Sequence, residues 1–475
     1  RRTSNTGELM IILGTNSIKD TGYDVANSCR FDGSSAYLRK TFSGTSTDSN
    51  KCTMSFWCKK SSNGANLTLL TANIGGSSNR DRLYFDADDK LQFFLNNANN
   101  GNLLTNRLFR DNSAWYHICV AIDTTQGTAA NRVKIYINGT QETSFSTESY
   151  PAEDYALTGF GHSVEHTIGA DDSDGGSNEY YNGYMAEVAF VNGVAHAVTD
   201  FGKFDSDSPT IWKPKDVSGL TFGTNGFYLD FEDSSSLGND AAGSNNFTAT
   251  NLAATDQATD TPTNNFATWN PLFGASNLSY AEGNAEISCS ADGWFESGAT
   301  IGISTGKWYF ELKCTLGSGT YSSESIKFGT CDASRINDGS GEIQRAENHY
   351  QADGNSVNDD TISGVGTFPT FTTGDIVGCA VDMTNRKIYY HKNGTYINSG
   401  NPSSGSNGFD ISSSFDFVLP AISMYESGTK GEVNFGNPSF SISSGNADAD
   451  GYGNFEYSVP SGFYALCTKN LAEYG

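Results

Sequence analysis

The sequence predicts an all-β protein that is built from two antiparallel domains. A strand–turn–strand pattern occurs twice, at 115–140 and at 376–395, and apolar residues alternate along both strands of each copy. The chain is rich in strand formers and turn formers, with 30 Phe, 23 Tyr and 52 Gly, and it has no long amphipathic helical pattern. The copies lie about 250 residues apart, too far for a tandem repeat, which indicates two domains of related architecture.

Each hairpin ends on an Asn-Gly pair, which supplies the positive φ angles that a type I′ turn needs. These pairs are Asn138-Gly139 and Asn393-Gly394. The alternating apolar residues are Ile118, Val120, Ile122, Val133, Ile135 and Ile137 in the first copy, and Val377, Cys379, Val381, Ile388 and Tyr390 in the second. We interpret both hairpins as core scaffold and both Asn-Gly pairs as turn chemistry, so function is expected in the loops around them.

The net charge of the chain limits the classes of partner that it can bind. The formal net charge is −25, and such an acidic field repels nucleic-acid phosphates and anionic membranes. The apolar run Leu9–Leu13 is far too short to span a bilayer, and no secretory signal pattern is seen. We therefore expect neither nucleic-acid binding nor membrane insertion.

The cysteine pattern predicts free thiols. There are nine cysteines, an odd number, and their spacing matches no zinc or redox motif. Several lie inside apolar strand patterns, namely Cys119, Cys314, Cys331 and Cys379. Buried free thiols indicate assembly in a reducing compartment.

Short segments in the first half of the chain follow the order of a known family. These segments are 31–38, 54–60, 115–123, 133–140, 167–170 and 180–195. Together they resemble a LamG-like jelly roll of the concanavalin A-like class, which we assign to residues 21–215. The family usually has Asp before the Glu of its closing strand, whereas Ala186 precedes Glu187 here.

A second series of segments resembles a SPRY domain. It consists of 306–313, 326–332, 374–382, 387–394, 419–423 and 431–436. The resemblance implies a second two-sheet β-sandwich, at residues 273–445. An N-terminal arm (1–20), a polar linker (216–272) and a C-terminal tail (446–475) complete the predicted organisation.

The linker carries a further resemblance. Its segment 226–272, placed between a LamG-like and a SPRY module, is similar to structural proteins of tailed bacteriophages, particularly marine ones. This resemblance implies a virion protein, assembled in the host cytoplasm and exposed on the particle exterior. Other virion proteins are then its expected partners, and a homotrimer is expected by analogy.

Enzyme activity is not expected. A glycosidase on a concanavalin A-like fold needs two carboxylates that face the cleft from one strand. The first domain has no Glu-x-Asp-x-Glu run, and the segment 342–347 has Gln344 where Asp is required. No catalytic residue is therefore assigned.

An acidic loop after 166–169 carries the candidate site residues. Calcium prefers oxygen ligands, and the family resemblance implies calcium at the rim of the jelly roll. The candidate calcium ligands are Asp171, Asp172, Asp174, Glu179 and Asp32, with a turn that holds no ion as the alternative. The candidate glycan-binding residues are Tyr180, Tyr181, Asn178 and Asn182, with strand packing as the alternative for the tyrosines. In the SPRY domain the loop 333–372 is the candidate contact loop.

The function predicted from these observations is that of a phage fibre, spike or capsid-surface appendage. Its two sandwiches act in assembly and in adhesion to host-surface glycans, strengthened by multivalency on the particle. One alternative is a secreted or cell-surface bacterial lectin or adhesin, disfavoured by the missing signal pattern and the unpaired cysteines. Another is a glycoside hydrolase of the same fold, disfavoured by the missing carboxylate pair.

Overall fold

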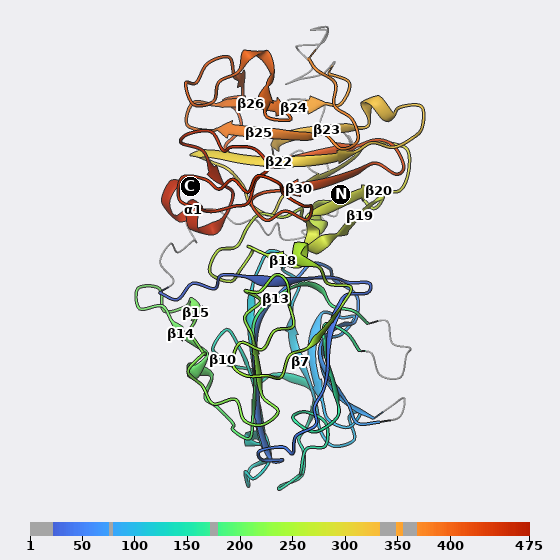
Figure 1. Ribbon diagram of the computed structural model, residues 1–475, viewed down its shortest axis with the longest axis vertical. Coiled ribbons are helices and arrows are strands. Elements are labelled where there is room, and N and C mark those ends of the chain that lie inside the picture. The colour runs from blue at the N-terminus through green and yellow to red at the C-terminus, as the bar shows by residue number, and fades with distance from the viewer. Residues whose placement is uncertain (1–21, 76–78, 172–178, 333–347, 355–367) are drawn as a thin grey trace, which may run out of the picture. The chain divides into compact units, whose positions relative to one another are not determined.

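The computed structural model describes residues 22–75, 79–171, 179–332, 348–354 and 368–475. The chain divides after Asn265 into two compact units. We call the part that ends at Asn265 the first unit and the part from Phe266 to Gly475 the second unit. Strands dominate both units, which confirms the all-β prediction (Figure 1).

The first unit contains two antiparallel eight-stranded sheets among its described residues. Sheet A has the order β10–β9–β8–β3–β13–β1–β18, with β16 beside β13. Its strands are β10 (Thr140–Gln141), β9 (Val133–Ile137), β8 (Tyr116–Asp123), β3 (Lys51–Lys60), β13 (Asn182–Asn192), β1 (Ser28–Asp32), β18 (Gln257–Ala258) and β16 (Phe227–Leu229). Sheet B has the order β11–β7–β6–β5–β4–β12–β2–β17. Its strands are β11 (Phe145–Ser149), β7 (Asn102–Leu108), β6 (Lys90–Phe94), β5 (Arg80–Phe85), β4 (Leu67–Asn73), β12 (Glu165–Ile168), β2 (Tyr37–Thr41) and β17 (Thr248–Thr250).

The second unit has a nine-stranded sheet C and a four-stranded sheet D in its described residues. The order of sheet C is β19–β20–β30–β22–β25–β26–β27, with β28 beside β26 and β31 beside β22. Its strands are β19 (Leu278–Ala281), β20 (Glu286–Cys289), β30 (Lys430–Asn434), β22 (Lys307–Thr315), β25 (Ile376–Asp382), β26 (Lys387–Lys392), β27 (Thr395–Tyr396), β28 (Phe409–Asp410) and β31 (Tyr464–Ala465). The order of sheet D is β21–β29–β23–β24, with β21 (Phe295–Gly298), β29 (Val418–Met424), β23 (Ile326–Asp332) and β24 (Asn348–Gln351).

Helices are short throughout the described chain. The α-helix is α1 (Thr468–Tyr474). The 3₁₀ helices are η2 (Ala129–Asn131), η3 (Val198–Asp200), η4 (Ala254–Asp256), η5 (Pro271–Phe273), η6 (Glu282–Asn284), η7 (Ser322–Glu324) and η10 (Ile397–Ser399). No helix of the described residues has the length and apolar character that crossing a membrane requires.

Each unit has one main apolar core, and each core contains one of the two predicted hairpins. The alternating residues of β8 and β9 are buried between sheets A and B, and those of β25 and β26 are buried in the core of the second unit. All nine cysteines are free and buried, as predicted. The sequence patterns therefore identified the inward face of both hairpins correctly.

The two Asn-Gly pairs play the same structural part in both units. Asn138 and Asn393 each have φ of 48°, and they join β9 to β10 and β26 to β27. The side-chain oxygen of Asn138 accepts the backbone N–H of His117 at 2.7 Å, and that of Asn393 accepts the N–H of Ile376 at 2.9 Å. Each asparagine thus links its turn to the start of the first strand of the hairpin, which is β8 in the first unit and β25 in the second.

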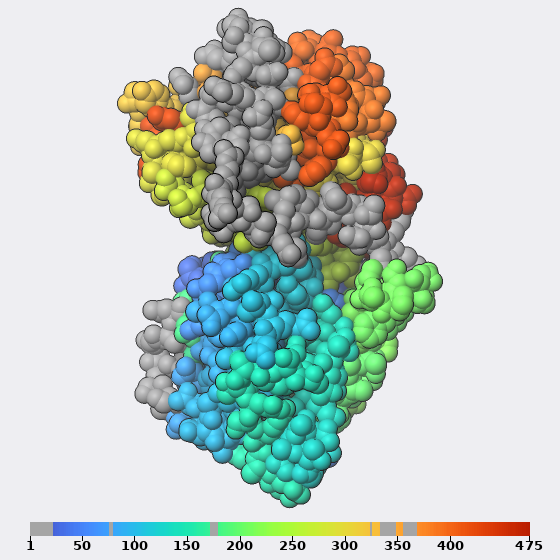
Figure 2. Space-filling model, turned by 180° about the vertical axis from the view of Figure 1, so that it is seen from behind, coloured from blue at the N-terminus to red at the C-terminus, as the bar shows by residue number. Residues whose placement is uncertain are grey.

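The outer face of sheet A is covered by a later part of the chain. We call residues 193–231 the covering segment. It includes the hairpin of β14 (Gly202–Phe204) and β15 (Trp212–Pro214), which stands at the side of the first unit (Figure 1 and Figure 2). The residues of this second, smaller core are Val25, Trp57, Cys119, Ala186, Ala189, Val191, Val198, Phe201, Trp212, Val217, Phe222 and Tyr228. Burial on both faces makes sheet A a central layer.

Most of the segment predicted as a linker, 216–272, belongs to the first unit. The strands β16, β17 and β18 lie in it and pair with β13, β2 and β1. A buried ion pair holds its end, because Lys59 Nζ lies 2.8 Å from Asp260 Oδ2 and donates to Asn265 Oδ1 at 2.7 Å. Trp115 Nε1 donates to the other carboxylate oxygen of Asp260 at 2.8 Å. Polar residues of this segment, whose abundance indicated a linker, therefore form buried hydrogen bonds with the first unit.

The C-terminal tail likewise packs into the second unit. The carboxylate of Glu311, fully buried in β22, accepts the backbone N–H groups of Glu456 at 3.0 Å and Tyr457 at 2.8 Å. The hydroxyl of Tyr309 donates to the same carboxylate at 2.8 Å. Burial raises the pKa of Glu311, and these donors oppose that shift. The tail is thus bound through hydrogen bonds to a buried acid.

A strained glutamate interrupts β13. Glu187 has φ of 53°, in the left-handed region, where the pairing register of β13 with β3 shifts. Its side chain is 7% exposed, and it accepts hydrogen bonds from Tyr228 Oη at 2.7 Å and Tyr23 Oη at 3.3 Å. Burial raises its pKa to about 7, an effect that the tyrosine donors oppose and the nearby charges of Asp230 and Glu232 increase.

The first prediction concerns the buried ion pair. Lys59→Met removes the ammonium that faces the buried carboxylate of Asp260; the two side chains are 1% and 0% exposed. We expect the free energy of unfolding of the first unit to fall by about 3–5 kcal/mol in urea denaturation. Arg39→Met is the control, because it removes an exposed pair with Glu165 and should cost less than about 1 kcal/mol. Equal losses in the two variants would contradict the assignment.

The second prediction concerns pH. Because the folded-state pKa of Glu187 is raised from 4.5 to about 7, the folded protein keeps a proton that the unfolded chain loses. The contribution of Glu187 to the free energy of unfolding is therefore fully present below pH 4.5. It is lost as pH rises toward 7, which lowers the free energy of unfolding by roughly 3 kcal/mol. Glu187→Gln should remove this loss, so its stability relative to wild type rises from pH 4.5 to pH 8. The exposed Glu148→Gln should show no such rise; a flat difference for Glu187→Gln would refute the prediction.

Candidate functional site

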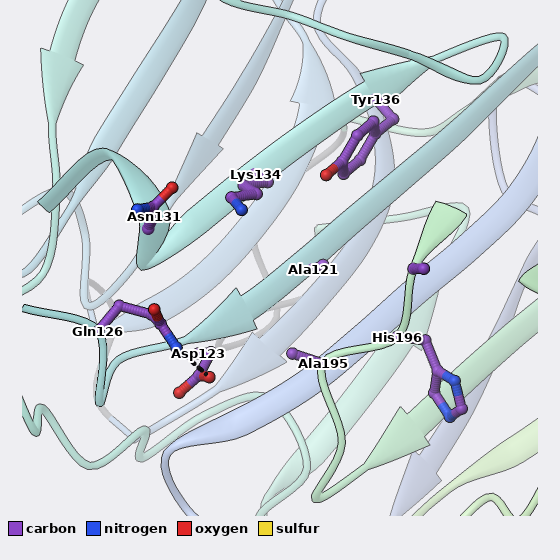
Figure 3. A pocket seen from close by; sticks show the side chains of 9 residues that line it. Ala121, Asp123, Gln126, Asn131, Lys134, Tyr136, Ala195 and His196 are labelled. Carbon is purple, nitrogen blue, oxygen red and sulfur yellow. Dashed lines mark hydrogen bonds between the residues drawn. The ribbon is translucent and has the colours of Figure 1, made fainter. Parts of the chain in front are cut away.

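A pocket of about 310 Å³ opens on the outer face of sheet A. Strands β8 and β9 form its floor, and its walls come from the loop 124–131 and from the start of the covering segment. Its lining residues are Ala121, Asp123, Gln126, Asn131, Lys134, Tyr136, Ala195, His196 and Ala197 (Figure 3). We call it the β8–β9 pocket.

The alternation of β9 builds the floor of this pocket. Because Val133, Ile135 and Ile137 face the core, Lys134 and Tyr136 face outward. Figure 3 shows Lys134 and Tyr136 in a row along β9, on the pocket side. Both side chains are half-buried, and within the described chain neither the ammonium nor the hydroxyl has a hydrogen-bond partner. The floor thus presents two polar groups that a ligand can use.

Arg132 holds the loop that forms one wall. Its Nε donates to the carbonyl of Gln126 at 2.8 Å, one Nη to the carbonyl of Gly127 at 3.1 Å, and the other Nη to the carbonyl of Pro151 at 2.9 Å. The Gln126 side chain in turn donates to Asp123 Oδ2 at 2.8 Å, a contact drawn in Figure 3. This wall is therefore fixed by hydrogen bonds before any ligand binds.

The opposite wall is held through a buried threonine. Thr53 Oγ1, in β3, donates to the carbonyl of Val194 at 2.8 Å and accepts the backbone N–H of His196 at 2.8 Å. The imidazole of His196 is engaged elsewhere, since its Nδ1 lies 2.8 Å from Asp200 Oδ2. Thr53 thus attaches the backbone of residues 194–196, which form the second wall of the pocket, to sheet A.

Two groups of the pocket have shifted pKa values. Burial opposes ionisation of Asp123, but hydrogen bonds from Thr125 and Gln126, together with the charge of Lys51, lower its pKa overall. Burial raises the pKa of Tyr136, with a smaller contribution from Cys119. At neutral pH the pocket therefore contains an ionised Asp123, saturated by its own loop, and a neutral tyrosine hydroxyl.

A Ser–His pair lies close to the pocket but lacks the arrangement of a nucleophile. Ser55 Oγ is 2.9 Å from His117 Nε2, while His117 Nδ1 accepts the indole N–H of Trp212 at 3.1 Å. Since Nδ1 is an acceptor, Nε2 carries the proton and donates to Ser55, so the imidazole cannot take a proton from that hydroxyl. Burial lowers the pKa of His117 to about 3. The pair is a neutral packing contact.

The predicted calcium ligands that the structure describes have protein partners. Asp171 is fully buried, with Oδ2 at 2.9 Å from Arg80 Nε and 3.3 Å from Arg82 Nη1. Glu179 forms an ion pair with the same Arg82, which brings the two carboxylates to one cation. Asp172 and Asp174 lie outside the described residues. Within the described part of the chain, no three His, Cys, Asp or Glu side chains gather as metal ligands do.

Asp32, the fifth predicted ligand, closes its own turn. Its Oδ1 accepts the backbone N–H groups of Ser34, Ser35 and Ala36 at 2.8–2.9 Å. Burial opposes ionisation, but these donors outweigh it and lower the pKa of Asp32 to about 2. The structure places Asp32 across from Asn182 in the pairing of β1 with β13. Calcium binding at this rim remains a prediction.

The predicted glycan residues divide into packed and accessible side chains. Tyr181 is fully buried, its hydroxyl donating to the carbonyl of Lys59 at 2.9 Å. Tyr180 is half-buried beside Tyr37, with ring centroids 6.3 Å apart. Asn182 is half-buried in β13, and Asn178 lies outside the described residues. Of this set, Tyr180 alone presents a partly exposed ring among the described residues.

The second unit presents an aromatic surface of its own. The rings of Trp294 and Tyr425 lie 5.3 Å apart, and those of Tyr425 and Tyr321 lie 5.1 Å apart, both edge to face. Tyr321 is 50% exposed, and the Lys327 ammonium lies 4.4 Å from the centroid of Trp294. Most of the candidate contact loop 333–372 lies outside the described residues. Among the described residues of the second unit, this aromatic cluster is the surface that we consider for binding.

Comparison with known proteins identifies the two domains. The model of the concanavalin A-like lectin/glucanases superfamily matches residues 32–197, and the SPRY domain model matches residues 307–438. The chain is 26% identical over 182 residues to a Ran-binding protein 9/10 homologue of Drosophila melanogaster. That match covers 36% of this chain and 17% of the relative.

Two solved structures are similar to parts of the chain. The SPRY domain of human HERC1 is 16% identical, with a TM-score of 0.26, over 35% of this chain and 96% of that one. A SAP-like pentraxin of Limulus polyphemus is 17% identical, with a TM-score of 0.28, over 38% of this chain and 82% of that one. The two family models confirm the two predicted domain types: the chain contains a concanavalin A-like domain followed by a SPRY domain.

Proposed function

We propose that the chain is a carbohydrate-binding adhesin and that the β8–β9 pocket holds a sugar residue. The observation that carries the proposal is the half-buried ring of Tyr136 beside the ammonium of Lys134, which has no hydrogen-bond partner among the residues that the structure describes. Sugars present apolar ring faces that stack on aromatic side chains, and hydroxyls that need donors and acceptors. A pocket of about 310 Å³ lies at the lower end of the range that small-ligand sites occupy.

The rigidity of the pocket supports binding. Its floor is β-strand, its first wall is held by Arg132, and its second wall is held by Thr53. Polar groups placed on such a frame lose little conformational entropy when a ligand arrives. The small side chains Ala121 and Ala195 leave space over the floor for a sugar ring.

The proposal includes the absence of catalysis at this pocket. Glycoside hydrolysis uses two carboxyl groups on either side of the scissile bond. Among the lining residues Asp123 is the one carboxylate, and its oxygens accept hydrogen bonds from Thr125 and Gln126. The neighbouring His117 has the tautomer that cannot activate Ser55. Recognition without turnover is the activity that fits these contacts.

We further propose that the adhesin belongs to a tailed-phage virion, on the exterior of the particle. The support is the resemblance of the segment 226–272, between the two modules, to phage structural proteins. Its partners would be other virion proteins and a host-surface glycan, and it would act as a homo-oligomer, a trimer by analogy. Many copies on one particle would convert weak sugar contacts into firm attachment.

The third prediction tests the pocket on a glycan array and by biolayer interferometry. Tyr136→Ala should weaken binding of the selected glycan about tenfold, because the stacking surface is lost. Tyr180→Ala is the matched control, since it removes the partly exposed tyrosine of the other candidate site. Loss of binding in Tyr180→Ala with none in Tyr136→Ala would place the site at the acidic loop instead. Turnover of any bound glycan would contradict the non-enzymatic proposal.

The fourth prediction concerns the particle. Mass spectrometry of purified virions of the phage that encodes the chain should detect its peptides at a stoichiometry of many copies per particle. Antibodies against the intact chain should bind unbroken virions, because the proposal places it outside. Detection in host membranes or culture supernatant, with none in virions, would favour the bacterial adhesin instead.

A further inference from the structure

We infer that the sugar bound in the β8–β9 pocket is acidic, with a carboxylate or sulfate group that pairs with Lys134. The inference rests on the proposed carbohydrate binding and adds the chemical class of the ligand. It starts from the charges of the described residues around this lysine.

Like Lys40, Lys51, Lys203 and Lys215, Lys134 has no ion pair in the described part of the first unit, but of these five lysines it alone lines the β8–β9 pocket. Carboxylates outnumber basic groups, with 54 Asp and Glu against 29 Lys and Arg. Basic residues of the first unit that have a carboxylate within 4 Å are Arg30, Arg39, Lys59, Lys60, Arg80, Arg82, Lys90, Arg107, Arg110, Arg132 and Lys213. Lys134 has no such partner in the described part of the chain, although it lies half-buried in a pocket.

The strand pairing explains why Lys134 has no counter-ion. Across β8 its pairing partner is Ala121, which carries no charge. The strand β10 pairs with β9 at Tyr136 and Ile137, so it adds no acid opposite Lys134. An acid at the cross-strand position would stabilise a lysine in a sheet. Here that position holds a methyl group, and the space above it belongs to the pocket.

Asp123, the carboxylate of the pocket, is already balanced. Its oxygens accept the N–H and hydroxyl of Thr125 and the amide of Gln126, at 2.6–3.2 Å. Lys51 lies directly across from it in the pairing of β3 with β8 and lowers its pKa through its charge. The charges of Asp123 and Lys51 offset each other, which leaves the ammonium of Lys134 as the uncompensated charge of the pocket.

The groups around Lys134 match an acidic sugar residue. The ammonium can donate to a carboxylate or sulfate, while the exposed amide of Asn131, from η2, and the hydroxyl of Tyr136, from β9, lie on either side of it (Figure 3). These neighbours can bind ring hydroxyls next to the acid group. At physiological ionic strength charges are screened within about 8 Å, so the nearby lysine outweighs the distant negative charge of the chain.

The test uses pairs of oligosaccharides that differ only in charge. One pair is a uronate oligosaccharide and its neutral methyl ester, and another is a sulfated oligosaccharide and its unsulfated form. The full chain should bind at least one acidic member about tenfold more tightly than its neutral partner in biolayer interferometry. The pair that shows the preference identifies carboxylate or sulfate as the recognised group.

Three variants then assign the preference to a residue. Lys134→Met should abolish the preference, so that the acidic and neutral members of a pair bind with equal affinity. Lys134→Arg should retain it, because the charge remains. Lys40→Met, which removes a lysine from β2 of sheet B, should bind as wild type does.

The outcomes separate the inference from the function on which it rests. Equal binding of both members of every pair, or a preference that survives in Lys134→Met, overturns the acidic-sugar inference alone. Binding of neutral sugars that depends on Tyr136 would then keep the proposed function. If no sugar of either kind binds, the proposed function fails and the inference fails with it.

Discussion

The two-residue alternation along β8 and β9 is the constraint on which the first unit depends. Because of this alternation, Val133, Ile135 and Ile137 lie in the core, and Lys134 and Tyr136 lie on the opposite face. A shift of one residue in the pairing would exchange these faces, exposing the apolar side chains and burying the lysine. The turn at Asn138, bonded back to His117, prevents that shift. Core and pocket are thus two consequences of one pairing register.

Buried polar contacts then select which later segments cover the sheets. Burying Lys59 and Asp260 costs desolvation that their mutual attraction only partly offsets, so the pair adds little net stability compared with apolar side chains. Lys59 and Trp115 both donate to Asp260, so the pair attaches the segment 216–265 to the first unit at one defined position. Glu187 shows the opposite case, a buried acid with tyrosine donors and no ion pair among the described residues, and burial raises its pKa.

The sequence predicted what is local and missed what depends on distant partners. Alternation in β8 and β25 is visible in short windows, so the cores and both Asn-Gly turns were identified correctly. The ion pairs of Asp171 with Arg80 and Arg82 were not predicted, because the two arginines lie far away in sequence. The pocket was missed for the same reason. Tyr136 and Lys134 could be recognised as outward-facing residues of a strand, but the wall at Val194 forms only through Thr53.

The first and last described segments of the first unit lie next to each other. The backbone N–H of Val25 donates to Thr263 Oγ1 at 3.0 Å, and Ser28 Oγ donates to the carbonyl of Asp260 at 2.6 Å. A fold whose two ends are neighbours can be inserted into a surface loop of another protein with little disturbance to either. The first unit therefore has termini that suit the exchange of a whole domain between proteins by recombination. The exchanged fragment must extend to Asn265, where the unit ends.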